Sequence, residues 1–318
     1  MMMKRMSAII AFALTLVCTG QVSADFIKYK NYYIPIGQSQ DCSSISETKT
    51  NVIYIDDAAL SGEDPNGMLD ALIVLGWHQQ GRYNLLSIGS STSKNNASNN
   101  QTFMRQLVTM SSNLAAPIPV YRNSELVDEI ISQANLVYAC TGERLVISSG
   151  SEVHDIRDAV EQAPEIAEKI KLYVIAGSNF VKKDGKDPED YRFILSQLGN
   201  ANVFEMCDEP GDEDIVAATN CYESKNLRYP YSSRYSRQLS DSQKRAWVDR
   251  VYSDFSSIVT QDVKDSIRTQ NSNEGSGDHY LRVADYLTVA AVIWPNTDDI
   301  FRDYFIYDRL ESAVKSLR

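Results

Sequence analysis

The stretch NVIYIDDAALSGEDPNGMLDALIVL, residues 51–75, contains the elements that decide the fold. A β-branched and aromatic run at 52–55 is typical of a buried strand, and it ends on two carboxylates, Asp56 and Asp57. A polar loop follows, and an apolar helix then begins near Asp70. This order predicts a parallel α/β unit whose acidic groups lie at the carboxyl end of the strand, where open α/β sheets bind ligands.

The acidic end of this segment indicates carboxylate chemistry. Carboxylate oxygens gathered in this way suit a hard divalent cation such as calcium or magnesium. The alternative interpretation is a solvated acidic loop with no chemical role, because a single acidic segment is a weak motif. The chain has no GxSxG elbow, phosphate-binding glycine loop or dinucleotide fingerprint, so the corresponding enzyme classes lose support.

Apolar strand-like runs alternate with helical patterns along most of the chain. The predicted strands are 52–57, 84–89, 118–121, 144–148, 171–176 and 202–206. The predicted helices are 67–77, 100–112, 124–135, 153–161, 188–198, 241–258, 281–293 and 298–317. This alternation predicts an α/β fold with an open, mostly parallel, doubly wound sheet, helices on both faces and a helical C-terminal end.

The first 24 residues have the pattern of an export signal. Lys4 and Arg5 form a basic start, the apolar stretch that follows is too short to span a bilayer, and small residues precede a cleavage site at Ala24. We therefore expect an exported protein, periplasmic or secreted, that is cleaved near Ala24. Residues 25–50 are predicted to be irregular, and 51–318 to form the α/β domain.

The charge of the chain limits its partners. The full sequence has 31 Lys and Arg against 42 Asp and Glu, and loss of Lys4 and Arg5 with the signal would leave 29 against 42, a net charge of −13. Such an acidic chain is unsuited to nucleic acids or anionic membrane surfaces. No later stretch approaches a membrane span, and a homo-oligomer is among the expected forms of the protein.

Four cysteines lie after the expected cleavage site. They are Cys42, Cys140, Cys207 and Cys221. An even number in an exported chain favours disulfide bonds, and four cysteines allow three connectivities. Cys207 and Cys221 flank one acidic loop and are the first pair to expect, which leaves Cys42 with Cys140. The alternative is that all four are reduced and buried.

Five segments of the sequence follow one another in a characteristic order. Their order and spacing identify a protein family more specifically than any single segment does. They are the run at 52–75, LLSIGSSTSKNNASNNQTFMRQLV followed by IPVYRNS, LVISSGSEVHDIRDAVEQAPEIAEKIKLYVIAGSNF, DPEDYRFIL, and VADYLTVAAVIWP. Taken together they resemble the nucleoside hydrolase (inosine-uridine preferring) superfamily, which consists of calcium-dependent N-ribosyl hydrolases with an open α/β fold. The resemblance covers most of residues 51–300.

The resemblance implies a calcium site and a catalytic base. The implied calcium ligands are Asp57 or Asp56, Asp70, the backbone carbonyl of Val153, and Asp285. Either Asp57 or Asp56 would also activate the attacking water. The loop before Asp70 is longer than in the family, so both aspartates stay open, and an ungapped match would put Ala58 at the base position.

Four residues are candidates for binding a nucleoside or sugar-type ligand. The resemblance points to Ser91 and His154, where the family has asparagines, whereas Asn179 is a candidate because it follows a strand and Tyr229 because its ring could stack on a base or sugar. Two departures weaken the family pattern: Leu69 stands where the family has an aspartate that holds a ribose hydroxyl, and Ala284 replaces a histidine that assists the leaving group. The implied function is hydrolysis of an N-glycosidic bond with a calcium-bound water. The alternative is a catalytically impaired ligand-binding or effector protein on the same scaffold.

Overall fold

The structure is a computed structural model, and it describes part of the chain. The described residues are 25–29, 32–36, 41–57, 66–91, 97–175, 188–206, 246, 249–251, 253–255, 286–294 and 306–318. The chain divides into two units, Met1–Asp41 and Cys42–Arg318.

The first unit contains a short antiparallel hairpin. Strands β1 (Asp25–Tyr29) and β2 (Tyr32–Ile36) pair with Ile27 opposite Ile34. This finding corrects the expectation that 25–50 is irregular throughout, because β-branched and aromatic residues on both sides of a two-residue connection favour a hairpin.

The second unit is built on a six-stranded sheet. Its strands are β3 (Asn51–Asp56), β4 (Asn84–Ser90), β5 (Val120–Tyr121), β6 (Leu145–Ser149), β7 (Ile170–Ile175) and β8 (Val203–Met206). They lie in the order β5-β4-β3-β6-β7-β8, and every neighbouring pair is parallel. The predicted open, parallel α/β sheet is confirmed.

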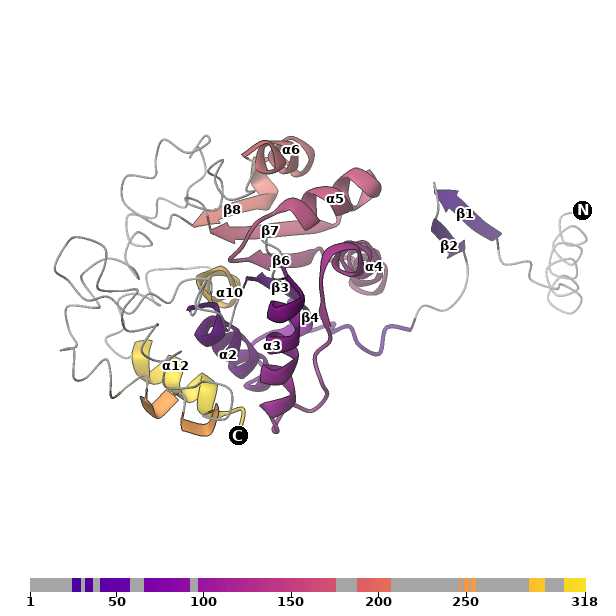
Figure 1. The fold of residues 1–318 in the computed structure, drawn as a ribbon. Helices are drawn as coiled ribbons and strands as arrows, with labels where there is room; N and C mark the ends of the chain where they lie inside the picture. Colours follow the sequence, from indigo (N-terminus) through magenta and orange to yellow (C-terminus); the bar gives the residue numbers. More distant parts are fainter. Residues whose placement is uncertain are drawn as a thin grey trace, which may run out of the picture. The chain divides into compact units, whose positions relative to one another are not determined.

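Helices follow the strands and cover both faces of this sheet (Figure 1). They are α2 (Asn66–Gln79), α3 (Ala97–Met110), α4 (Asn123–Thr141), α5 (His154–Gln162), α6 (Pro188–Leu198), α10 (Tyr286–Ile293) and α12 (Ile306–Lys315). None of the helices in the described part of the chain is long and apolar enough to cross a membrane.

Two hydrophobic clusters divide the core between the faces. Along β3, Val52 and Tyr54 pack in one cluster with α2, α3, α10 and α12, whereas Ile53 and Ile55 pack in the other with α4, α5 and α6. Alternate residues of a strand point to opposite faces, so an uninterrupted apolar strand supplies both clusters. The burial of all six β3 residues therefore explains the continuous apolar run that opens the domain.

The strand order creates a switch point between β3 and β6. The chain runs from β3 outwards to β4 and β5, and then returns through α4 to place β6 on the other side of β3. Open α/β sheets bind ligands outside the carboxyl ends of the strands at such a point. The residues that follow β3 and β6 are therefore candidates for binding a ligand.

A disulfide bond joins Cys42 to Cys140, near the end of α4. The two Cα atoms are 5.9 Å apart, a usual separation for such a bond. The predicted pairing of Cys42 with Cys140 is confirmed, whereas Cys207 and Cys221 lie outside the described residues.

The contact between α2 and α12 depends on a glycine. A Cβ atom on Gly76 would lie 2.0 Å from the carbonyl oxygen of Ala313, so the two helix backbones approach too closely for any side chain. We expect Gly76→Ala to lower the free energy of unfolding by about 2 kcal/mol, because displacing α12 outweighs the better helix propensity of alanine.

Chemical denaturation with urea measures this effect, and Gly142→Ala is the matched control. Gly142 has a positive φ of 72° but open space around its Cα, so its substitution is expected to cost only about 1 kcal/mol. Equal losses in the two variants would contradict the close approach of α2 and α12.

Candidate functional site

Buried polar side chains collect at the carboxyl ends of the three central strands. Asp56 ends β3, Ser90 ends β4 and Ser149 ends β6, and all three are fully buried. Most residues before them in these strands are apolar, with Asn51, Ser87 and Ser148 as buried polar exceptions. This edge includes the switch point between β3 and β6.

The end of β3 is fixed by a side-chain contact from within the same strand. The Tyr54 hydroxyl donates a hydrogen bond to the Asp56 carboxylate, and both residues lie on the same face because they are two positions apart. The Tyr54 ring is fully buried in the core, so it holds one oxygen of the carboxylate in place. The next residue, Asp57, is half-buried.

Backbone contacts join the three strand ends into one surface. The Ser91 N–H donates to the carbonyl of Asp56 at 3.1 Å, and the Gly150 N–H donates to the carbonyl of Ile55 at 3.0 Å. The Ser151 hydroxyl in turn donates to the carbonyl of Ser91 at 3.1 Å. The sequence-predicted ligand residue Ser91 therefore lies beside Asp56 and beside the loop after β6.

The start of α3 is tied to the same surface. The side-chain amide of Asn100, in the first turn of α3, donates to the carbonyl of Asp57 at 3.2 Å. Asn100 is 2% exposed, and its side-chain oxygen has no hydrogen-bond partner in the described part of the chain. The site thus draws residues from the ends of β3, β4 and β6 and from α3.

His154 lies between two buried acids where β6 leads into α5. Its Nδ1 is 3.4 Å from Glu152 Oε2, and its Nε2 is 3.4 Å from Asp155 Oδ1. Burial lowers the pKa of His154, but the hydrogen bond with Glu152 and the surrounding negative charges outweigh burial and raise that pKa above its ordinary value. The protonated imidazolium is therefore favoured between these two carboxylates.

Asp155 combines burial with nearby donors. Burial raises the pKa of its carboxyl above the ordinary value, although the His154 charge and a hydrogen bond from the Ser91 hydroxyl act in the opposite direction. Its position in the first turn of α5 favours the ionised form through the helix dipole. Asp155 therefore interacts with two neighbours, His154, whose Nε2 lies 3.4 Å from its Oδ1, and the Ser91 hydroxyl.

The described residues do not by themselves form a calcium site. No group of three His, Cys, Asp or Glu side chains that could hold a metal ion occurs among them. The Val153 carbonyl, an expected ligand, accepts the N–H of Arg157 at 2.9 Å in the first turn of α5. Asp70 is fully buried in α2, as a ligand on that helix would be, but calcium would need a further carboxylate.

Several predicted site residues lie outside the described part of the chain. They are Asp285, Asn179, Tyr229, Cys207 and Cys221. Asp285 directly precedes α10 in the sequence. Within α10, the buried Thr288 side chain accepts a hydrogen bond from the Ser148 hydroxyl, which ties this helix to the carboxyl-terminal part of β6.

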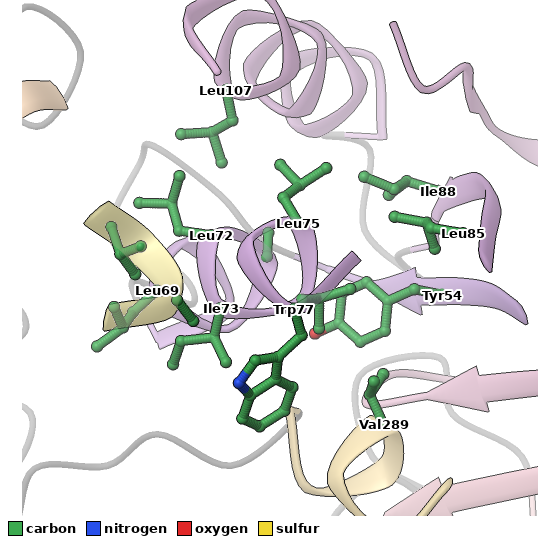
Figure 2. Packing of buried hydrophobic residues seen from close by; sticks show 14 of the residues in the cluster. Tyr54, Leu69, Leu72, Ile73, Leu75, Trp77, Leu85, Ile88, Leu107 and Val289 are labelled. Carbon is green, nitrogen blue, oxygen red and sulfur yellow. The ribbon is translucent and has the colours of Figure 1, made fainter. Parts of the chain in front are cut away.

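Leu69 points into the core (Figure 2). It is fully buried, and its cluster includes Leu72, Ile73 and Val289. The residue that the resemblance aligns with a ribose-binding aspartate is therefore a core side chain of α2.

Sequence reasoning missed Tyr54, Asn100, Glu152 and Asp155. Two sequence patterns could have indicated them. Tyr54 and Asp56 are two positions apart and so lie on one face of a strand, and the polar run SGSEVHD directly follows the apolar strand LVIS. Asn100 carried no such signal, because its role depends on a tertiary contact between α3 and β3.

The order of the parallel strands and the polar carboxyl edge define an open α/β protein with the nucleoside hydrolase fold. Similarity to two solved structures supports this assignment of the fold. One is the type III effector protein XopQ complexed with adenosine diphosphate ribose. Its sequence is 10% identical, the similarity covers 86% of this chain and 95% of that chain, and the TM-score is 0.56. The other is the purine-preferring ribonucleoside hydrolase from Gardnerella vaginalis. Its sequence is 15% identical, the similarity covers 77% of this chain and 80% of that chain, and the TM-score is 0.51.

These similarities confirm the predicted resemblance at the level of the fold. No protein-family model matches the chain, and no curated protein sequence matches it. At such low identities the shared architecture carries no assignment of activity.

Proposed function

We propose that this chain binds a ribosyl compound, a nucleoside or a nucleotide derivative, at the carboxyl edge of β3, β4 and β6. The observation that carries the proposal is the set of buried polar side chains at the switch point of the sheet. The Ser90 hydroxyl and the side-chain oxygen of Asn100 are buried with no hydrogen-bond partner in the described part of the chain, which is unfavourable, and a polyhydroxylated ligand offers both donors and acceptors. The proposal favours binding over catalysis because Leu69 removes a carboxylate that the family uses to orient ribose.

The structural neighbours support this choice of ligand. The XopQ structure holds adenosine diphosphate ribose on the same fold, and it covers most of this chain. The hydrolase from Gardnerella vaginalis is described as acting on purine ribonucleosides. Ribose is common to both ligand classes, whereas phosphate is not.

Ligand-induced thermal stabilisation tests the proposal. The purified chain is heated with adenosine, inosine, uridine and ADP-ribose, and with adenine as the control that lacks ribose. A ligand present at about 100 times its dissociation constant adds about 2.7 kcal/mol to stability, which raises the melting temperature by several degrees. At least one ribosyl compound is expected to do so, adenine is not, and no free base is expected to form. The absence of any shift across the panel would overturn the proposal.

Calcium-dependent hydrolysis of an N-glycosidic bond is the second candidate function, and the position of Asp70 on α2, where the resemblance places a calcium ligand, favours it. Asp285, from the segment before α10, is the residue that would add a further carboxylate to Asp70 and to Asp56 or Asp57.

Release of free ribose separates the two candidates. Hydrolysis predicts that nucleosides yield ribose in calcium and none in chelator, and that Asp285→Asn removes any stabilisation by calcium, whereas the exposed Asp254→Asn does not. Binding without turnover predicts no ribose under either condition.

We also propose that the chain is exported, with cleavage near Ala24. The Cys42–Cys140 disulfide supports this localisation, since such bonds persist mainly in oxidising compartments.

A further inference from the structure

We infer that His78 forms an acid-sensitive latch, a hydrogen bond that holds the end of helix α2 to the start of strand β4 and that breaks when the imidazole takes up a proton. The latch lies at the amino-terminal edge of the sheet, away from the carboxyl edge to which the proposed function belongs, and it does not depend on that function. His78 is half-buried in the last turn of α2.

The ring of His78 bonds to backbone groups on both sides of the turn that follows α2. The Leu85 N–H donates to His78 Nδ1 at 3.0 Å. Only an unprotonated ring nitrogen accepts a hydrogen bond, so the ring is neutral and carries its proton on Nε2. The backbone of Tyr83 makes a further hydrogen bond with the imidazole. The side chain therefore fixes the end of α2 to the turn and to β4.

Leu85 lies at an irregular position of strand β4. Val52 of β3 pairs with Leu85, but the next residue of β3 pairs with Ser87. Leu86 is thus the extra residue of a β-bulge, which disrupts the ladder hydrogen bonds locally. On the other side of β4, pairing with β5 begins at Ile88. The imidazole supplies the acceptor for the Leu85 N–H, and losing it would leave a buried donor unpaired, which is unfavourable.

The surroundings of the ring oppose its protonation. A Cβ atom on Gly81 would lie 3.1 Å from Lys49 Nζ, so this ammonium group lies over the turn. Burial, and to a smaller extent the charge of Lys49, lower the pKa of His78 below its ordinary value of 6.5, although the backbone of Tyr83 acts in the opposite direction. The ring of Tyr83, 6.2 Å from the imidazole, adds no charge, because its hydroxyl donates to the carbonyl of Val74 and burial raises its pKa well above the ordinary value.

The lowered pKa sets the direction of the pH effect. When the turn opens, His78 is exposed to water and its pKa returns to 6.5, so the open form binds more protons than the closed form. The latch therefore contributes its full stability above pH 6.5 and loses it as the pH falls below 6.5 through the pKa of the closed form. A proton on Nδ1 also places one donor against another, the Leu85 N–H.

Amide hydrogen exchange measured by nuclear magnetic resonance at about pH 7.5 and about pH 5.5 tests the latch. Linkage allows the opening equilibrium at Leu85 to rise by at most about tenfold over this range, and we expect its protection factor to fall by at least about threefold. The matched amide is that of Leu145, at the start of β6, which donates to the carbonyl of Lys169 at 2.9 Å and so has an acceptor that does not titrate. Its protection factor should change by less than about twofold.

His78→Asn is the matched variant, because an asparagine oxygen accepts a hydrogen bond without titrating over this range. In that variant the protection factor of Leu85 should change by less than about twofold between the two pH values. The imidazole signal of the wild-type chain gives a second measurement that needs no substitution at the latch. Its titration midpoint should lie below pH 6.5, and Lys49→Gln, at an exposed residue, should raise it.

Three results would overturn the latch. They are equal losses of protection at Leu85 and Leu145 in the wild-type chain, a loss at Leu85 that persists in His78→Asn, and a wild-type His78 midpoint at or above pH 6.5. None of them affects the proposed function, which the stabilisation panel judges separately.

Discussion

Replacing Leu69 by aspartate is expected to destabilise the protein strongly, although it restores the residue that the family uses at this position. The side chain is fully buried in the apolar cluster that α2 shares with α10 and α12, and an ionised carboxylate there would lose its hydration without gaining a charged partner from that cluster. We expect the free energy of unfolding to fall by more than about 4 kcal/mol, the range of unpaired charges in a core. Urea denaturation measures the loss.

The matched control is Leu69→Met, which keeps an apolar side chain of similar volume. It is expected to cost less than about 1.5 kcal/mol. A Leu69→Asp variant as stable as wild type, with tighter binding of adenosine, would show instead that this position faces the ligand. That outcome would contradict the separation of the α2 core from the carboxyl edge.

Removing the disulfide between Cys42 and Cys140 is expected to have an effect of similar size. The bond closes a loop between residues that are 98 positions apart, and loss of the cross-link gives the unfolded chain more conformational freedom. The chain-entropy relation gives about 4–5 kcal/mol for a loop of this length. The double variant Cys42→Ser/Cys140→Ser should therefore unfold at a much lower urea concentration.

Dithiothreitol provides an independent measurement of the same bond. The wild-type chain in reductant should approach the stability of the double variant, while the double variant itself should change little. Equal stability of the wild-type chain and the variant without reductant would contradict a formed Cys42–Cys140 bond. Export to an oxidising compartment would then lose its structural support.

The architecture could be predicted because it follows from local patterns. The six predicted strands overlap β3 to β8, since buried parallel strands are continuous apolar runs and the helices between them have a different period. The helix over 281–293 was predicted from an apolar run before Pro295, and α10 ends at Ile293. The strand order was not predictable in this way, because pairing between distant strands depends on tertiary contacts.

The candidate site was predicted less completely, for two physical reasons. Asp56 ends one strand and Ser91 directly follows another, so strand prediction located them. Asp155 and Glu152 acquire their roles from contacts with His154 and Ser91, which strand prediction cannot provide. Conversely, the position of Leu69 suggested only a missing ligand, whereas its burial shows that the residue contributes to the core.

Hydrogen–deuterium exchange with and without ADP-ribose tests most directly whether a ribosyl compound binds at the carboxyl edge of the sheet. The account predicts that the ligand slows exchange in the segments that end β4 and β6 and begin α3 and α5, within residues 89–91, 97–101 and 149–157. It predicts little change in α12, at 306–315. Protection confined to other segments, or no change at a concentration that stabilises the protein, would contradict it.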